Sequence, residues 1–187
     1  MPPSNKQKKI EKKKAKAKAK LKKANLSKNL NPAARLINSS LEYPIYECVL
    51  NIVEIGSGML NLLVTKKTRT GDLVLAAFLV DTFCLGVKDC FIRLTSIEQY
   101  NRDKAKRSLQ DRKPEDAKKL LIDVVKWSRQ IGIQPHKEYK TAIKIFDGIN
   151  EANSDAKFEF GKDGGPLFIP GPNDSPIKCR QIQNLLG

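Results

Sequence analysis

The stretch that decides the fold is LAAFLVDTFCLGVKDCFIR, residues 75–93, the most apolar run in a lysine-rich chain. Extended back to Leu73, its first part is apolar without interruption through Val80, which predicts a strand buried on both faces and therefore central in a sheet. After Gly86 the spacing changes to one face of a helix, because apolar residues recur at Val87, Cys90, Phe91, Leu94 and Ile97. We therefore predict a strand over 73–81 followed by a helix that begins after Gly86.

Two more strands are predicted before this one. Residues 45–55 and 59–67 are rich in β-branched and apolar residues, and the glycine-containing segment 56–58 separates them. Residues 68–72 read as a turn in which Gly71 supplies a positive φ. Three strands with short connections predict an antiparallel meander.

Helix signals dominate the second half of the chain. Residues 114–132 begin with Pro114 at the first helical position and end at Gly132, and a shorter helix is predicted over 135–146. Segments around 162–165 predict a C-terminal β-hairpin, followed by a last helix over 176–187.

The predicted fold class is therefore α+β. It comprises an antiparallel sheet, built from a three-stranded meander plus the C-terminal hairpin, with helices packed on one side. We place this single domain at residues 45–187, after a polar linker over 25–44 and a tail over 1–24. A short helix is expected inside the linker, from Pro32.

Charge is distributed unevenly. The 187 residues contain 35 Lys+Arg and 20 Asp+Glu, a formal net charge of +15. Residues 1–24 hold eleven lysines and one acid, Glu11, so this tail carries +10 of that total. Like charges oppose helix formation and no apolar face is present, which predicts a disordered arm.

A lysine-rich arm of this kind predicts electrostatic binding to a polyanion. We expect a non-enzymatic binding protein associated with RNA or the ribosome, with DNA as another possible partner. The basic turn between the second and third strands would assist in placement. The expected nucleic-acid-binding residues are Lys8, Lys9, Lys12, Lys13, Lys14, Lys16, Lys18, Lys20, Lys22 and Lys23 in the arm, and Lys66, Lys67 and Arg69 at the turn.

Two other functions remain open from the sequence. Glu54, Asp81 and Asp89 are three acids on neighbouring predicted elements, and they could hold Mg²⁺ for metal-dependent phosphodiester hydrolysis. The structural alternative is that Asp81 caps a turn through backbone N–H groups and Asp89 complements a helix dipole. A third possibility is a protein-interaction module whose tail confers solubility.

The cysteines and apolar runs bound the setting. Cys48, Cys84, Cys90 and Cys179 form no CxxC pair, which favours free thiols in a reducing, cytoplasmic compartment and argues against a metal site. A reactive Cys84 with His136 as its base, and a small polar site at Asn173 and Asp174, are the remaining candidates. No apolar stretch reaches the ~18–20 residues of a membrane helix, and no secretory signal is expected.

Overall fold

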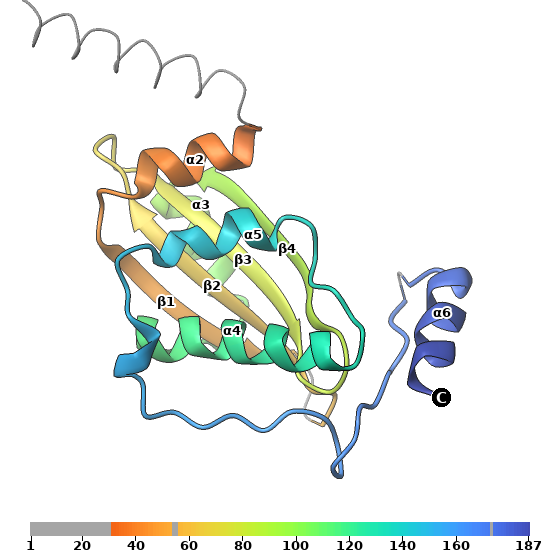
Figure 1. Cartoon of the computed structure of the whole chain (residues 1–187). Coiled ribbons are helices and arrows are strands. Elements are labelled where there is room, and N and C mark those ends of the chain that lie inside the picture. Colours follow the sequence, from red (N-terminus) through yellow and green to blue (C-terminus); the bar gives the residue numbers. More distant parts are fainter. Residues whose placement is uncertain (1–30, 54–55, 173) are drawn as a thin grey trace, which may run out of the picture.

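The computed structural model describes residues 31–187 except 54, 55 and 173 (Figure 1). The strands are β1 (Ile45–Ile52), β2 (Met59–Lys67), β3 (Leu73–Asp81), β4 (Gly86–Thr95) and β5 (Gln110–Asp111). The helices are α2 (Pro32–Ser40), α3 (Ile97–Lys104), α4 (Pro114–Gln130), α5 (Tyr139–Ala142) and α6 (Pro176–Leu186), with short 3₁₀ helices η1 (Ile143–Phe146) and η2 (Glu151–Asn153). The predicted basic arm over 1–24 lies outside the described residues.

The strands form one antiparallel sheet in the order β4-β3-β2-β1-β5. The α+β class and the β1–β3 meander are therefore confirmed, and β3 lies between β2 and β4 as its continuous apolar run predicts. The turn from β2 to β3 contains Gly71 at φ 92°, a backbone conformation that glycine adopts without strain.

The two faces of the sheet are covered differently. On the face toward α2, α4 and α5, which we call the helical face, Val74, Ala76, Phe78 and Val80 of β3 join the main core. On the opposite face, Leu73, Leu75 and Ala77 pack against Tyr100 of α3. The expectation that helices lie on one side only is wrong, because α3 lies behind the sheet (Figure 1).

The helix predicted from Val87 is also wrong, because this segment is the ten-residue strand β4. A β-bulge explains the misleading pattern. Val80 pairs with Val87 and Leu79 pairs with Asp89, so Lys88 is an extra residue on the β4 side. The bulge changes the usual spacing of two between core positions to three, from Val87 to Cys90, and a spacing of three is typical of a helix.

The predicted C-terminal hairpin does not form as a ladder of strands. Only an isolated bridge joins Lys162 and Gly165. The flanking backbone bonds instead to the turn between β3 and β4, since Gly161 N–H donates to Thr82 O at 2.8 Å and Leu167 N–H donates to Phe83 O at 2.9 Å. The chain then continues to α6, which has Ser175 as its N-cap and Pro176 in its first turn, as predicted.

Part of the segment predicted as a linker belongs to the packed structure. Asn31 caps α2, and Pro32 begins the helix as expected. Ile37 of α2 is fully buried in the main core, so packing begins before residue 45. In the part of the chain that the structure describes, no helix combines the length and apolar character needed to cross a bilayer.

Candidate functional site

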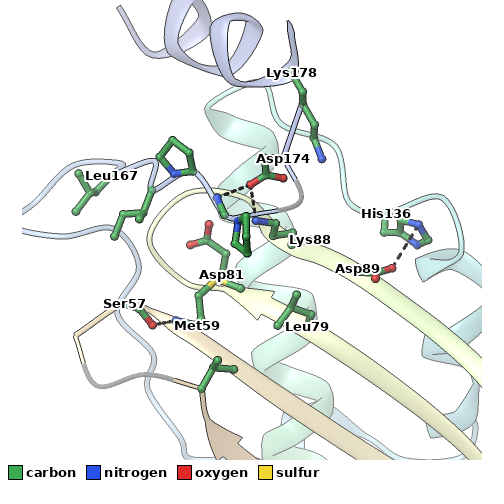
Figure 2. Close-up of a pocket in the computed structure, with 15 residues that line it drawn as sticks. Ser57, Met59, Leu79, Asp81, Lys88, Asp89, His136, Leu167, Asp174 and Lys178 are labelled. Carbon is green, nitrogen blue, oxygen red and sulfur yellow. Dashed lines mark hydrogen bonds and ion pairs between the residues drawn. The ribbon is translucent and has the colours of Figure 1, made fainter. Parts of the chain in front are cut away.

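A cavity of about 590 Å³ lies where β3 ends, between the sheet and the C-terminal segment (Figure 2). Met59 of β2 and Leu79 of β3 supply apolar walls, and Leu167 closes it from the C-terminal segment. Its polar groups include Asp81, Lys88, Asp89, His136, Asp174 and Lys178. The fold thus brings together Asp81 and Asp89, two of the three acids predicted from the sequence, while Glu54 lies outside the described residues.

Asp81 is only 4% exposed and caps the turn that follows β3. Its Oδ1 accepts the backbone N–H groups of Phe83 at 2.8 Å and Cys84 at 3.0 Å. Burial raises the pKa of this carboxyl, because the charged form is desolvated, and the amide hydrogen bonds oppose the shift. This is the capping role that the sequence left open as the structural alternative.

Asp89 lies on β4 and not in the first turn of a helix. The prediction that it complements a helix dipole is therefore wrong. Its Oδ1 is 3.6 Å from His136 Nε2, while Nδ1 of the same ring is 3.5 Å from Cys90 Sγ. His136 N–H also donates to Val87 O at the edge of β4. His136 lies just before α5, and this backbone hydrogen bond attaches the segment between α4 and α5 to the edge strand β4.

The thiol beside His136 is that of Cys90 and not that of Cys84, the candidate nucleophile from the sequence. Burial, together with the nearby charges of Asp89 and Glu138, raises the pKa of Cys90 to about 12. Burial also raises the pKa of Cys84 to about 11 and that of Cys48 to about 12. These buried thiols remain protonated near neutral pH, whereas the thiolate is the reactive form of cysteine.

The contact that closes the cavity was missed by sequence reasoning. Lys88 Nζ donates to Asp174 Oδ2 at 2.7 Å, and the same oxygen accepts Gly171 N–H at 2.8 Å. Lys88 is the bulged residue of β4, and bulges commonly redirect a side chain. Asp174 was predicted as a polar-site candidate, but its partner lies 86 residues earlier in the chain, and no local pattern links the two. Asn173, the other candidate, lies outside the described residues.

The described residues around this cavity do not provide a set of side chains that could hold a metal ion. Among the described residues, no group of three or more His, Cys, Asp or Glu side chains is placed to hold a metal ion. Asp81 is committed to the turn, and Asp89 faces His136. The Mg²⁺-dependent hydrolase considered from the sequence therefore gains no support from this geometry.

The basic turn between β2 and β3 exposes fewer positive charges than expected. Lys66 is only 2% exposed, and its Nζ donates to Leu41 O at 3.4 Å at the end of α2. It therefore helps to join α2 to the sheet and does not present its charge on the surface. Lys67 and Arg69 are exposed, and Lys67 Nζ lies 5.8 Å from the centroid of the Tyr46 ring.

Comparison with known proteins gives no indication of the function of this chain. No family model matches it, and no curated protein or solved structure is significantly similar.

Proposed function

We propose that this protein binds RNA, free or within the ribosome, through its lysine-rich N-terminal arm. The observation that carries the proposal is the charge of residues 1–24, +10 from eleven lysines and a single acid. Each lysine that neutralises a phosphate releases condensed counterions, which favours binding with little sequence preference. Lysine suits this task because its ammonium is a point charge that contacts the phosphate backbone without a fixed geometry.

The arrangement of the described residues supports this assignment. In the sequence the arm precedes α2, and α2 crosses the end of the sheet that carries the turn between β2 and β3 (Figure 1). Lys66 links the two, because its amine reaches Leu41 at the C-terminal end of α2. Lys67 and Arg69 at that turn are exposed and would add two positive charges for the same polyanion. The cavity with its three aspartates lies at the other end of β3 from this turn.

The test compares four chains binding a labelled RNA by fluorescence anisotropy over a range of salt concentrations. They are the full chain, a chain lacking residues 1–24, and chains with all eleven arm lysines replaced by glutamine or by arginine. Deletion and glutamine replacement should weaken binding sharply and flatten the salt dependence, by about 0.7 in log–log slope per lysine engaged with a single strand. Arginine replacement should preserve both, because the charge is unchanged.

A matched control removes charge elsewhere. Lys137, Lys140 and Lys144 are exposed lysines near α5, and replacing all three with glutamine should change the slope little. If the chain lacking residues 1–24 binds RNA as well as the full chain at every salt concentration, the proposal is wrong. A partner that remains bound after nuclease treatment of a cell extract would instead favour the protein-interaction alternative.

A further inference from the structure

The face of the sheet opposite the helical face is only partly covered by α3. Beside that helix, a hollow of about 110 Å³ opens on the sheet surface. Asn61 of β2 and Phe91 and Arg93 of β4 form its sheet side, while Tyr100 and Arg107 border it from α3 and the residues that follow. This volume is below the about 150 Å³ of a protein cavity that binds benzene, so an aromatic ring would lie only partly within the hollow.

Phe91 is the unusual residue of this surface. Its side chain is 48% exposed although it lies within a ten-residue strand, and its ring borders the hollow. The guanidinium carbon of Arg93 lies 5.8 Å from the ring centroid. An exposed aromatic ring beside a guanidinium on an open antiparallel sheet has the chemistry that stacks on an unpaired base.

The charges around the hollow leave one cation available. Arg93 pairs with Asp103 at 3.0 Å, and Lys104 pairs with Glu47 on β1. Within the described residues, Arg107 forms no ion pair and no side-chain hydrogen bond, although it borders the hollow. A guanidinium in this position can bind a phosphate with two parallel hydrogen bonds.

The polar group on the floor of the hollow is also uncommitted. Asn61 lies opposite Asn51 across the β1–β2 pair. The Asn51 amide donates to Ile52 O at 3.3 Å, whereas the Asn61 amide forms no hydrogen bond with the described residues. An amide offers one acceptor and two donors, which can pair with the edge of a nucleobase.

We propose that this hollow binds one unpaired nucleobase of single-stranded RNA. The base stacks on Phe91, its edge meets Asn61, and the adjoining phosphate pairs with Arg107. The inference deepens the proposed function and rests on it, because the arm supplies the affinity and the hollow distinguishes single strands from duplexes. Bases in a duplex are stacked on one another and cannot lie on the ring.

The probe is a nine-nucleotide RNA with 2-aminopurine at its centre, used as a single strand and annealed to its complement. The chains are wild type, Phe91→Leu, Phe91→Trp, Arg107→Gln and Leu94→Ala. Leu94 is the matched control because it lies on the same strand and is 49% exposed, yet it does not line the hollow. Circular dichroism and urea unfolding confirm that each variant folds.

Binding to wild type should quench the 2-aminopurine fluorescence through stacking. Phe91→Leu should abolish that quenching and weaken single-strand binding about 5- to 150-fold, with duplex binding and the salt slope unchanged. Phe91→Trp should retain it, and Leu94→Ala should behave as wild type. Arg107→Gln should lower the salt slope by about 0.7, as expected for the loss of one phosphate contact.

The two proposals fail separately. If wild type leaves the fluorescence unchanged, or if Phe91→Leu binds the single strand as Leu94→Ala does, the base site is wrong, whatever the arm does. If deletion of residues 1–24 leaves the salt slope intact while Phe91→Leu still loses quenching, the base site stands and the role of the arm is wrong.

Discussion

For the side chain of Asp81, a catalytic role and a structural role lead to opposite expectations about whether its negative charge is needed. Its two amide hydrogen bonds hold the turn between β3 and β4, and one of those amides belongs to the fully buried Cys84. An uncharged oxygen in the same place could accept both bonds. A metal ligand or a general base, by contrast, would need the ionised form.

The pH dependence of stability separates these roles. Burial raises the folded-state pKa of Asp81 above its ordinary value of 3.8, so the folded chain keeps a proton that the unfolded chain has already released. Within that window the folded state binds more protons, and the contribution of Asp81 to the free energy of unfolding falls as pH rises. Above the folded pKa the contribution no longer changes.

Asp81→Asn should therefore gain stability relative to wild type as pH rises through the window between 3.8 and the raised folded-state pKa, because asparagine accepts both amides without ionising. Asp81→Ala should lose about 1–3 kcal/mol, because the amides are left unpaired. Urea unfolding of the three chains at several pH values measures both effects. Equal destabilisation by asparagine and alanine at neutral pH would contradict the capping role and point to a need for the charged carboxylate.

At the scale of elements, the turn between β3 and β4 is shaped by its contact with α4. Gly86 has φ 66°, and a Cβ at this position would lie 2.5 Å from Ser128 Oγ and 3.3 Å from the Val124 carbonyl oxygen. Gly71, at φ 92° in the turn between β2 and β3, has open space around it. The two glycines share a backbone requirement, but only Gly86 is also fixed by packing.

Gly86→Ala should cost clearly more stability than Gly71→Ala, for which the backbone strain alone is about 1–2 kcal/mol. Combining Gly86→Ala with Ser128→Gly should recover part of the difference, because the clashing side chain is removed. Urea unfolding of the single and double variants gives the coupling energy. Equal costs at the two glycines, or no coupling with Ser128, would show that the turn does not depend on α4.

The elements that sequence reasoning predicted well are those with strong local signals. Pro114 at the start of α4 and Gly132 after its end bound that helix, and Ile133 N–H donates to Ser128 O at 2.9 Å as in a Schellman motif. β4 was missed because its bulge is defined by pairing with β3, which no local spacing records. The C-terminal hairpin was predicted wrongly, because the backbone of its two segments bonds to the β3–β4 turn and not to each other as a ladder.

The candidate sites follow the same division. Asp81 and Asp89 could be chosen from the sequence because they are acids on neighbouring predicted elements. Lys88, His136 and Asp174 meet them through tertiary contacts, and sequence spacing carries no signal for these. Lys66 was placed correctly at the end of β2, but its burial depends on α2 folding over that end of the sheet.

On the scale of the whole molecule, the C-terminal region, residues 166–187, is joined to the rest of the fold by few contacts. The described residues form no regular strand between η2 and α6, and α6 packs mainly through Ile182 onto Cys84 and Leu85. The Lys88–Asp174 ion pair holds this region over the cavity (Figure 2). Regions with few buried contacts can open without global unfolding.

Asp174→Ala should therefore release the C-terminal region while the sheet remains folded. The lost charge-assisted hydrogen bonds are worth about 1.5–3 kcal/mol, or roughly 10- to 150-fold faster amide exchange in residues 166–187. Hydrogen exchange read by mass spectrometry should show this increase, with β3 and α4 protected as in wild type. The matched control is Asp123→Ala, which breaks the partly exposed Lys119–Asp123 pair on α4 and should leave residues 166–187 unchanged.

Acid should mimic the substitution. Although burial alone raises the pKa of Asp174, the bonds from Lys88 and Gly171 lower it overall, so the ion pair stabilises the closed state above the ordinary carboxyl value of 3.8. That contribution is lost as pH falls through the lowered pKa, and wild type should then approach the exchange pattern of Asp174→Ala. If Asp174→Ala instead speeds exchange in β3 and the C-terminal region together, the two open as one unit. The cavity at the end of β3 would then open only when the sheet unfolds.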